Sequence, residues 1–227
     1  AEDLWLRIKA AEALAAMGSE ALPAVPDLLQ LLANRDPERD PRGMQQRYLC
    51  FALFGRQDGL LRGSLEDVDR EELYAAVRMG LANEDGRARG AIGTVYQNLS
   101  YREIQPILPV IVDAVATPAP SGIMFADEIR LSGLELLAQN QHAEGLDHFI
   151  EVLGADRWGA GNRISRCLKL LQKYGGSARS LLPELLAIEE QLLAENNPKQ
   201  AEIDLLRETV TLIEEDRNPP KLRRIEE

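Results

Sequence analysis

Apolar side chains recur along most of this chain at a spacing that places them on one face of an α-helix. In residues 3–17, Leu4, Ile8, Ala11 and Leu14 lie three or four residues apart, which is the periodicity of an amphipathic helix. Gly18 follows them, and glycine is favoured just after the last turn of a helix. The pattern returns in weaker form further along, so it predicts a succession of short helices.

The predicted helices group into pairs, and each pair makes one repeat. Pro26 follows Gly18 by eight residues, and the same spacing separates Asn98 from Pro106 and Gly175 from Pro183. The predicted first helices cover 3–17, 42–55, 86–98, 125–139 and 161–174, and the second helices 21–33, 69–82, 101–116, 143–153 and 178–195. The repeats are therefore 3–33, 42–82, 86–116, 125–153 and 161–195, followed by a closing helix over 198–216 and a loosely ordered tail over 217–227.

Composition supports helices over strands. Aromatic residues make up only 5% of the 227 residues, and runs of β-branched or aromatic residues with period two are nearly absent. We therefore predict an all-α fold. A single helical hairpin of about 40 residues cannot bury its apolar face alone, whereas stacked hairpins share a continuous core. The expected architecture is one α-solenoid over residues 1–216.

Several predicted first helices begin with an acidic or amide residue and carry an arginine one turn later. These pairs are Asp3 with Arg7, Asp85 with Arg89, Asp127 with Arg130, and Asn162 with Arg166. A side-chain oxygen at a helix start accepts backbone N–H groups. We expect each arginine to reach the corresponding residue of the neighbouring repeat, so that the pairs form a ladder that sets the register of the repeats.

The run Asp3-x-x-x-Arg7-x-x-Ala10-Ala11-x-Ala13-Leu14, followed by Gly18 and by Pro26-x-Leu28-Leu29-x-Leu31-Leu32, resembles the HEAT repeat of bacterial HEAT-like proteins, which were first named from phycobilisome lyases. The resemblance covers essentially the whole chain. It implies a right-handed α–α superhelix in which the second helices line the concave side. Residues 40–48 and 85–93 also resemble the C-terminal part of large uncharacterised bacterial HEAT proteins, a resemblance that implies no activity.

The charge of the chain restricts its partners. The net charge is −11, and affinity for nucleic acid or for anionic membranes comes largely from Lys and Arg. We therefore expect neither partner. No apolar run reaches the length of about 18 residues needed to span a bilayer, and no signal-peptide pattern is present. Leu4, Trp5 and Leu6 are apolar without a polar helix before them, so we expect a longer parent protein whose preceding repeat stacks on the first hairpin.

Candidate catalytic chemistry is sparse. The two histidines, His142 and His148, do not supply a metal-ligand set, and Cys50 and Cys167 lie in apolar helical patterns typical of buried thiols. No nucleophile motif or phosphate-binding loop is present. We expect no metal and no cofactor. The resemblance leaves one enzyme alternative, a bilin-lyase-like protein that uses the concave groove.

The predicted second helices carry many carboxylates, which makes the expected concave face acidic. The candidate binding residues on it are Glu71, Glu72, Asp113, Asp147, Glu151 and Glu184. The loop over 56–68 and the segment with Met124 and Phe125 are further candidates, as is Trp158, because Trp is frequent at interface hot spots; the alternative is that these side chains fold back over repeat junctions. We therefore predict a monomeric, non-catalytic module that binds a basic protein or other domains of its own longer chain.

Overall fold

The chain is mostly helical in the residues that the structure describes. A computed structural model describes residues 3–84, 86–117, 126–153 and 160–225. These ranges contain α-helices and 3-10 helices joined by turns, with one isolated β-bridge and no β-strand. The predicted all-α fold class is confirmed. Among the helices of these ranges, none combines the length and the hydropathy needed to cross a membrane.

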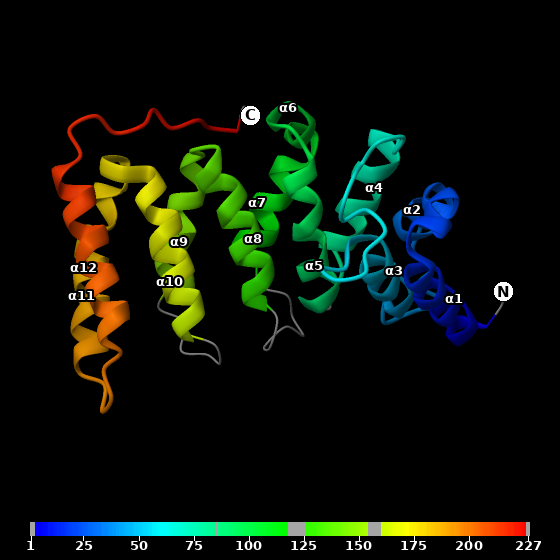
Figure 1. Ribbon diagram of the computed structural model, residues 1–227, viewed down its shortest axis with the longest axis horizontal. Coiled ribbons are helices and arrows are strands. Elements are labelled where there is room, and N and C mark those ends of the chain that lie inside the picture. Colours follow the sequence, from blue (N-terminus) through cyan, green and yellow to red (C-terminus); the bar gives the residue numbers. More distant parts are fainter. Residues whose placement is uncertain (1–2, 85, 118–125, 154–159, 226–227) are drawn as a thin grey trace. The chain divides into compact units, whose positions relative to one another are not determined.

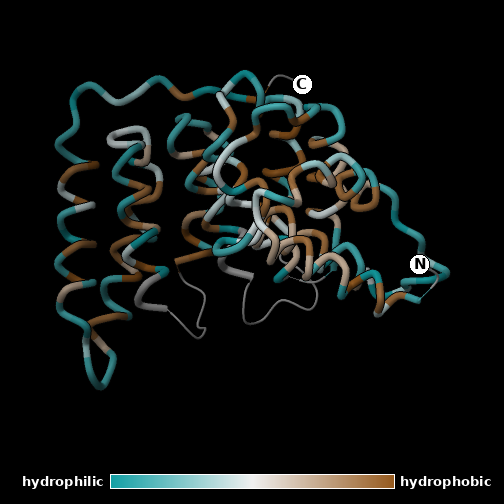
Figure 2. The backbone as a smooth tube through the Cα atoms, turned by 45° about the vertical axis from the view of Figure 1, so that its right-hand side comes forward, coloured by the Kyte–Doolittle hydropathy of each residue, from teal (hydrophilic) through white to brown (hydrophobic). Residues whose placement is uncertain are grey.

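The chain divides into two compact units. The first unit ends at Ser132 and the second begins at Gly133, so the division falls within helix α8 (Ala126–Gln139). Each unit has its own set of buried aliphatic side chains. Figure 2 shows hydrophobic and hydrophilic segments alternating along the helices, as expected for helices that bury one face.

The helices of the first unit lie in two rows. In chain order it contains α1 (Leu4–Met17), η1 (Gly18–Ala24), α2 (Val25–Ala33), α3 (Met44–Phe54), α4 (Arg70–Leu81), α5 (Gly86–Ile92), η2 (Gly93–Asn98), α6 (Tyr101–Ile104), η3 (Gln105–Ile107) and α7 (Leu108–Ala116), where η denotes a 3-10 helix. Helix α3 packs between α1 and α5, whereas α4 packs on α2 and α7 (Figure 1). Within this unit, the first helices of the predicted pairs thus contact one another, and so do the second helices.

Side chains at the helix starts determine where these helices begin. The Asp3 carboxylate accepts the backbone N–H of Leu6 at 3.0 Å, and Gly18 ends α1 with a φ of 62°. At the start of α3, the buried Asp40 accepts the backbone N–H groups of Met44 at 2.8 Å and Gln45 at 2.6 Å. These groups have no partner inside a helix, so the acidic residues satisfy them and fix the first turn.

Three predicted helices of the first unit are interrupted where the sequence contains Pro or Gly. The helix predicted over 21–33 is η1 followed by α2, with Pro23 inside η1. The helix predicted over 86–98 changes to a 3-10 helix at Gly93, and the one predicted over 101–116 is divided into α6, η3 and α7 around Pro106. Proline removes a backbone donor from the helical ladder, which explains the breaks at Pro23 and Pro106.

The second unit contains the C-terminal part of α8 and four further α-helices. Its remaining elements are η4 (Ala143–Gly145), α9 (Leu146–Leu153), α10 (Ala160–Leu171), η5 (Gln172–Leu181), α11 (Leu182–Leu193) and α12 (Gln200–Glu215). Helix α10 packs on α9 and α12, and α11 also packs on α12. The sequence placed Ile203, Leu206, Val210 and Ile213 on the apolar side of the closing helix, and all four are buried in α12.

The segment after α12, for which the sequence predicts a loosely ordered tail over 217–227, forms backbone hydrogen bonds in the part that the structure describes. Arg223 pairs through its backbone with the residues around His142, because its N–H donates to Gln141 O and its carbonyl accepts from Ala143 N, both at 2.9 Å. The backbone N–H of Ile225 donates to Glu144 Oε1 at 2.9 Å. This segment is mostly hydrophilic (Figure 2) and has no helical periodicity, so its backbone pairing left no signal in the sequence.

Two of the predicted ladder arginines contact a neighbouring first helix. Arg7 Nη1 in α1 donates to Gln45 Oε1 in α3 at 3.1 Å, and Arg166 Nη2 in α10 lies 3.4 Å from Glu135 Oε2 in α8. Gln45 and Glu135 are not the helix-start residues that the sequence suggested as partners. Asp85 and the side chains of Asp127 and Asn162 lie outside the described residues.

The other two ladder arginines donate to backbone carbonyls near the ends of second helices. Arg89 is 8% exposed, and its Nε donates to Asn83 O at 2.6 Å while its Nη1 donates to Thr117 O at 3.1 Å. Arg130 Nε donates to Val115 O at 2.8 Å. The last carbonyls of a helix have no helical donor, so the guanidinium of Arg89 joins the ends of α4 and α7 by satisfying one carbonyl at each.

We predict that Arg89→Ala lowers the free energy of unfolding by about 2 to 4 kcal/mol, because it removes charge-assisted bonds to two carbonyls and leaves a gap among buried side chains. Arg87→Ala is the matched control on the same helix, since Arg87 is exposed, and we expect it to change stability by less than about 0.5 kcal/mol. Urea unfolding followed by circular dichroism measures both. Equal effects of the two substitutions would contradict this role for Arg89.

A second prediction concerns His142, which is 1% exposed and lies with its Nδ1 3.4 Å from Glu144 Oε2. Burial lowers the pKa of His142 below its ordinary value of 6.5, against the opposing effect of the Glu144 carboxylate. As the pH falls through 6.5, the unfolded chain therefore binds a proton that the folded chain does not. Stability is retained above this pH and decreases below it.

Chemical unfolding at a series of pH values between about 7 and 5.5 tests this prediction. We expect His142→Gln to flatten the pH dependence in that range, whereas His148→Gln, which removes the only other histidine of the sequence, keeps it. The same slope in wild type and His142→Gln would show that another group carries the dependence.

Candidate functional site

A groove opens in the first unit between the first hairpin and the long loop that joins α3 to α4. One wall consists of η1 and the N-terminal half of α2, and the other consists of residues 58–69 and the first turn of α4. Its volume is about 700 Å³. We call this feature the acidic groove, because the charged residues that line it are Asp58, Glu66, Asp67, Asp69 and Glu72.

The two walls differ in chemical character. The lining residues of η1 and α2 include no charged side chain, and their largest exposed member is Leu22, which is 46% exposed. Pro23 and Pro26 lie beside it and are also exposed. All five carboxylates come from the loop and from α4. The groove therefore presents an apolar wall opposite an acidic one.

No basic side chain lines the acidic groove. All five acidic residues are exposed, and none of them forms an ion pair within the part of the chain that the structure describes. Like charges around one opening repel one another, so the groove attracts cations. In the described residues, no three His, Cys, Asp or Glu side chains come together as ligands of a metal ion.

Close backbone packing shapes the first half of the acidic wall. Gly59 N donates to Gly55 O at 2.9 Å, and a side chain at Gly59 would collide with the backbone of Gly55. Leu60 and Leu61 donate to the carbonyls of Ala52 and Leu53, at 2.9 and 2.8 Å, and their side chains are buried. The loop is thus folded back on the end of α3.

A second anchor comes from η2. Asn98 Nδ2 donates to Leu61 O at 3.2 Å and to Arg62 O at 3.0 Å. The Arg62 side chain turns back into the loop, because its Nη1 donates to Arg56 O at 3.1 Å and Gln57 O at 2.8 Å. These bonds hold the middle of the loop in place. They also pair the Arg62 guanidinium with carbonyls of the loop.

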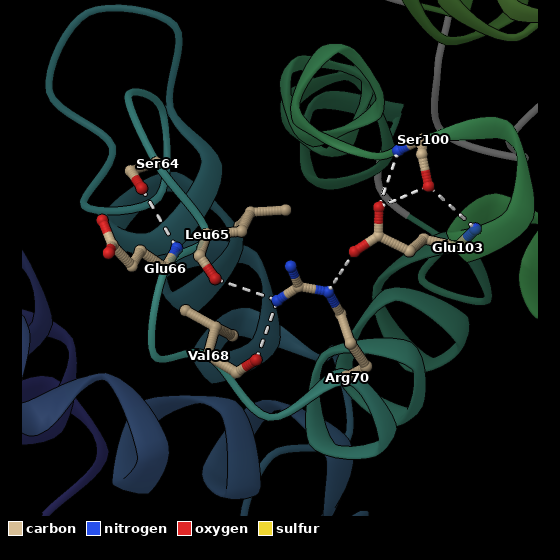
Figure 3. Close-up of polar contacts among 7 residues, drawn as sticks. All are labelled: Ser64, Leu65, Glu66, Val68, Arg70, Ser100 and Glu103. Atoms are coloured by element: carbon tan, nitrogen blue, oxygen red, sulfur yellow. Dashed lines mark hydrogen bonds and ion pairs between the residues drawn. The ribbon is translucent and has the colours of Figure 1, made fainter.

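Arg70, the first residue of α4, holds the second half of the acidic wall. Its Nη1 donates to Leu65 O at 2.9 Å and Val68 O at 2.8 Å, and its Nε donates to Glu103 Oε1 at 2.9 Å. Figure 3 shows the guanidinium between the loop carbonyls and the Glu103 carboxylate. We call this arrangement the Arg70 clasp. It ties the acidic wall both to its own helix and to α6.

The Glu103 carboxylate that completes the clasp is itself fixed. Its Oε2 accepts the Ser100 hydroxyl at 2.6 Å and the Ser100 backbone N–H at 2.9 Å, and Ser100 caps α6 in return. The hydrogen bonds from the Ser100 side chain and backbone and from Arg70 hold the pKa of Glu103 at about 2. The carboxylate is therefore charged at neutral pH and keeps Arg70 in place.

Asp67 stands at the rim in a left-handed backbone conformation, with a φ of 63°. Few residues other than glycine adopt this region, although aspartate is among those that tolerate it. Asp69, two residues later, also caps α4 by accepting the backbone N–H of Glu72 at 3.0 Å. The tight turn and the cap place several carboxylates close together along a short stretch of chain.

The structure brings one of the predicted binding residues, Glu72, into the groove. Glu71 and Asp113 are exposed elsewhere on the first unit, on α4 and α7. In the second unit, the exposed residues Asp147 and Glu151 lie on α9 and the exposed Glu184 on α11. Met124, Phe125 and Trp158 lie outside the described residues.

Sequence reasoning named the loop over 56–68 but missed its three lining carboxylates, Asp58, Glu66 and Asp67, and the apolar wall that faces them. The signal in the loop was the density of Asp and Glu beside the buried Leu60, Leu61 and Leu65. Cys50 and Cys167 are both buried thiols, as predicted. Comparison with protein-family models, with curated proteins and with solved structures found no match.

We predict that Arg70→Met loosens the acidic wall, because the carbonyls of Leu65 and Val68 lose the guanidinium of Arg70 as a donor. Amide hydrogen exchange across residues 64–69 should accelerate about tenfold, the equivalent of roughly one lost hydrogen bond. Arg78→Met is the matched control, since Arg78 lies on the same helix but donates to Pro106 O. Unchanged exchange in Arg70→Met would contradict the clasp.

The same variant tests the charge of Glu103. With Arg70 removed, the pKa of Glu103 should rise from about 2 toward its ordinary value of 4.5, which NMR titration of the carboxyl carbon measures. Because the folded pKa is depressed, the stabilising contribution is complete above pH 4.5 and is lost as the pH falls toward 2. An unaltered pKa in Arg70→Met would assign the shift to Ser100 alone.

Proposed function

We propose that the protein is a non-catalytic protein-interaction module of HEAT-like helical hairpins that binds a basic partner protein, with the acidic groove as its main contact. The partner is a separate protein or another domain of a longer parent chain. The observation that carries the proposal is the set of five carboxylates around the groove with no basic side chain in its lining. Interfaces that match opposite charges gain in specificity and in rate of association.

The proposed architecture is a right-handed α-solenoid of five hairpins and a closing helix. Its support in the first unit is the packing of α1, α3 and α5 in one row and of α2, α4 and α7 in the other, the arrangement expected where hairpins stack in sequence. The helical pairs lie close to the predicted repeats. A solenoid presents extended surfaces made of side chains from successive repeats, which suits binding to protein segments.

The alternative is a ligand-binding or bilin-lyase-like protein, and one observation favours a small ligand. The groove volume of about 700 Å³ falls within the range of small-molecule sites. The lining weighs against a bilin, because a tetrapyrrole carries carboxylates of its own and five carboxylates would repel them. A cationic group suits the same lining, so we place a protein partner first.

Partner capture with charge-reversed proteins tests the proposal. The groove variant carries Glu66→Lys and Glu72→Lys, and the face variant carries Glu71→Lys and Asp113→Lys, so both change the net charge equally. We expect wild type and the face variant to capture the same basic proteins from a cell extract, and the groove variant to lose them. Capture should weaken as salt rises from about 50 to 500 mM, because salt screens exposed charges.

Other outcomes would redirect or overturn the proposal. Loss of capture in the face variant alone would move the contact to the exposed faces of α4 and α7. Failure of all three proteins to capture any basic protein at low salt would contradict the interaction function, and the acidity would then serve only solvation. Far-UV circular dichroism of each variant verifies that the helices are intact.

A further inference from the structure

The two walls of the acidic groove specify the kind of segment that fits between them, provided that the proposed function holds. We infer that the groove binds a short extended peptide in which basic and apolar residues alternate. Successive side chains of an extended chain point to opposite sides. An alternating segment therefore directs its basic side chains to the carboxylates of the loop and α4, and its apolar side chains to Leu22 and the two prolines opposite.

Charge alone does not describe this lining. A ligand that is only cationic satisfies the acidic wall but leaves Leu22, Pro23 and Pro26 in water. A ligand that is only apolar covers that wall but takes water away from carboxylates that have no basic partner in the groove, which is unfavourable. A segment that alternates satisfies both walls at once, and basic side chains at every second position meet acids spread from Asp58 to Glu72.

Size and rigidity also favour a short peptide. A volume of about 700 Å³ accommodates a few residues and not a folded domain, since it matches the size of small-ligand sites. Both walls are fixed without a ligand. The bonds of Asn98 and the Arg70 clasp hold the loop, and the two prolines restrict the backbone of the opposite wall. A preformed site needs little ordering when the peptide binds.

Three fluorescein-labelled pentapeptides test the inference by fluorescence anisotropy with the full chain. The first alternates Arg-Leu-Arg-Leu-Arg, the second has the same composition in blocks as Arg-Arg-Arg-Leu-Leu, and the third replaces each Leu of the first by Ser. We expect the alternating peptide to bind about tenfold more tightly than either of the others, because only it places charges and apolar groups on opposite sides. Equal affinities for the first two would overturn the alternation.

Two pairs of matched variants locate the binding. Glu72 and Glu71 are adjacent exposed acids in the first turn of α4, and only Glu72 lines the groove. Leu22 and Leu31 are 46% and 45% exposed, and only Leu22 lines it. Glu72→Lys and Leu22→Ser should each weaken the alternating peptide by about fivefold or more, and Glu71→Lys and Leu31→Ser by less than about twofold. Equal effects within either pair would overturn the assignment to this groove.

The outcomes separate this inference from the proposed function. If the alternating peptide does not bind but captured basic proteins are still lost in the groove variant, the peptide pattern is wrong and the interaction module stands. If spermidine displaces the alternating peptide as effectively as unlabelled peptide does at equal concentration of positive charge, the apolar wall contributes nothing and the inference fails. If neither peptide nor partner binds, both fail.

Discussion

Short helices leave many backbone N–H and carbonyl groups without helical partners, and side chains from neighbouring elements must satisfy them. In this protein arginine side chains satisfy several of these backbone groups. Arg89 joins the ends of α4 and α7 through the carbonyls of Asn83 and Thr117, and Arg70 holds the loop before α4 through two more. A guanidinium suits this role, because its several donors form a rigid fork that bonds more than one carbonyl at once. The packing of the first unit and the shape of its groove both depend on these bonds.

The same bonds explain how an acidic rim arises beside basic residues. Arg62 and Arg70 are close in sequence to Glu66, Asp67 and Asp69, yet their guanidinium groups donate to loop carbonyls. Glu103, the carboxylate that pairs with Arg70, lies outside the groove lining. The carboxylates that line the groove are consequently exposed to solvent and remain available to a ligand. Local structure thus converts a stretch of mixed charge into a surface of one sign.

The sequence predicted the elements better than the contacts between them. Periodicity located the buried face of α12 correctly, from Ile203 to Ile213, because that signal is local. The groove could not be predicted in the same way, because it places Leu22 opposite Asp67, and these residues are far apart in the chain. No local sequence pattern shows which distant segments face each other. Glu72 was named among the carboxylates of the second helices, and the structure places it in the lining of the groove. The backbone pairing of Arg223 with residues 141–143 was missed, because main-chain hydrogen bonds of an extended segment hardly depend on side-chain identity.

Distributed acidity and a localised groove have different physical roles. Exposed acids such as Asp113, Asp147 and Glu184 contribute to a negative field that speeds the approach of any cation, but they do not discriminate among cations. Discrimination among cations requires a site in which charged groups lie beside an apolar surface of defined shape. Leu22, Pro23 and Pro26 provide that surface directly opposite the carboxylates of the groove. In the proposed complex, electrostatic attraction therefore sets how fast a basic segment arrives, and the apolar wall sets which segment stays bound.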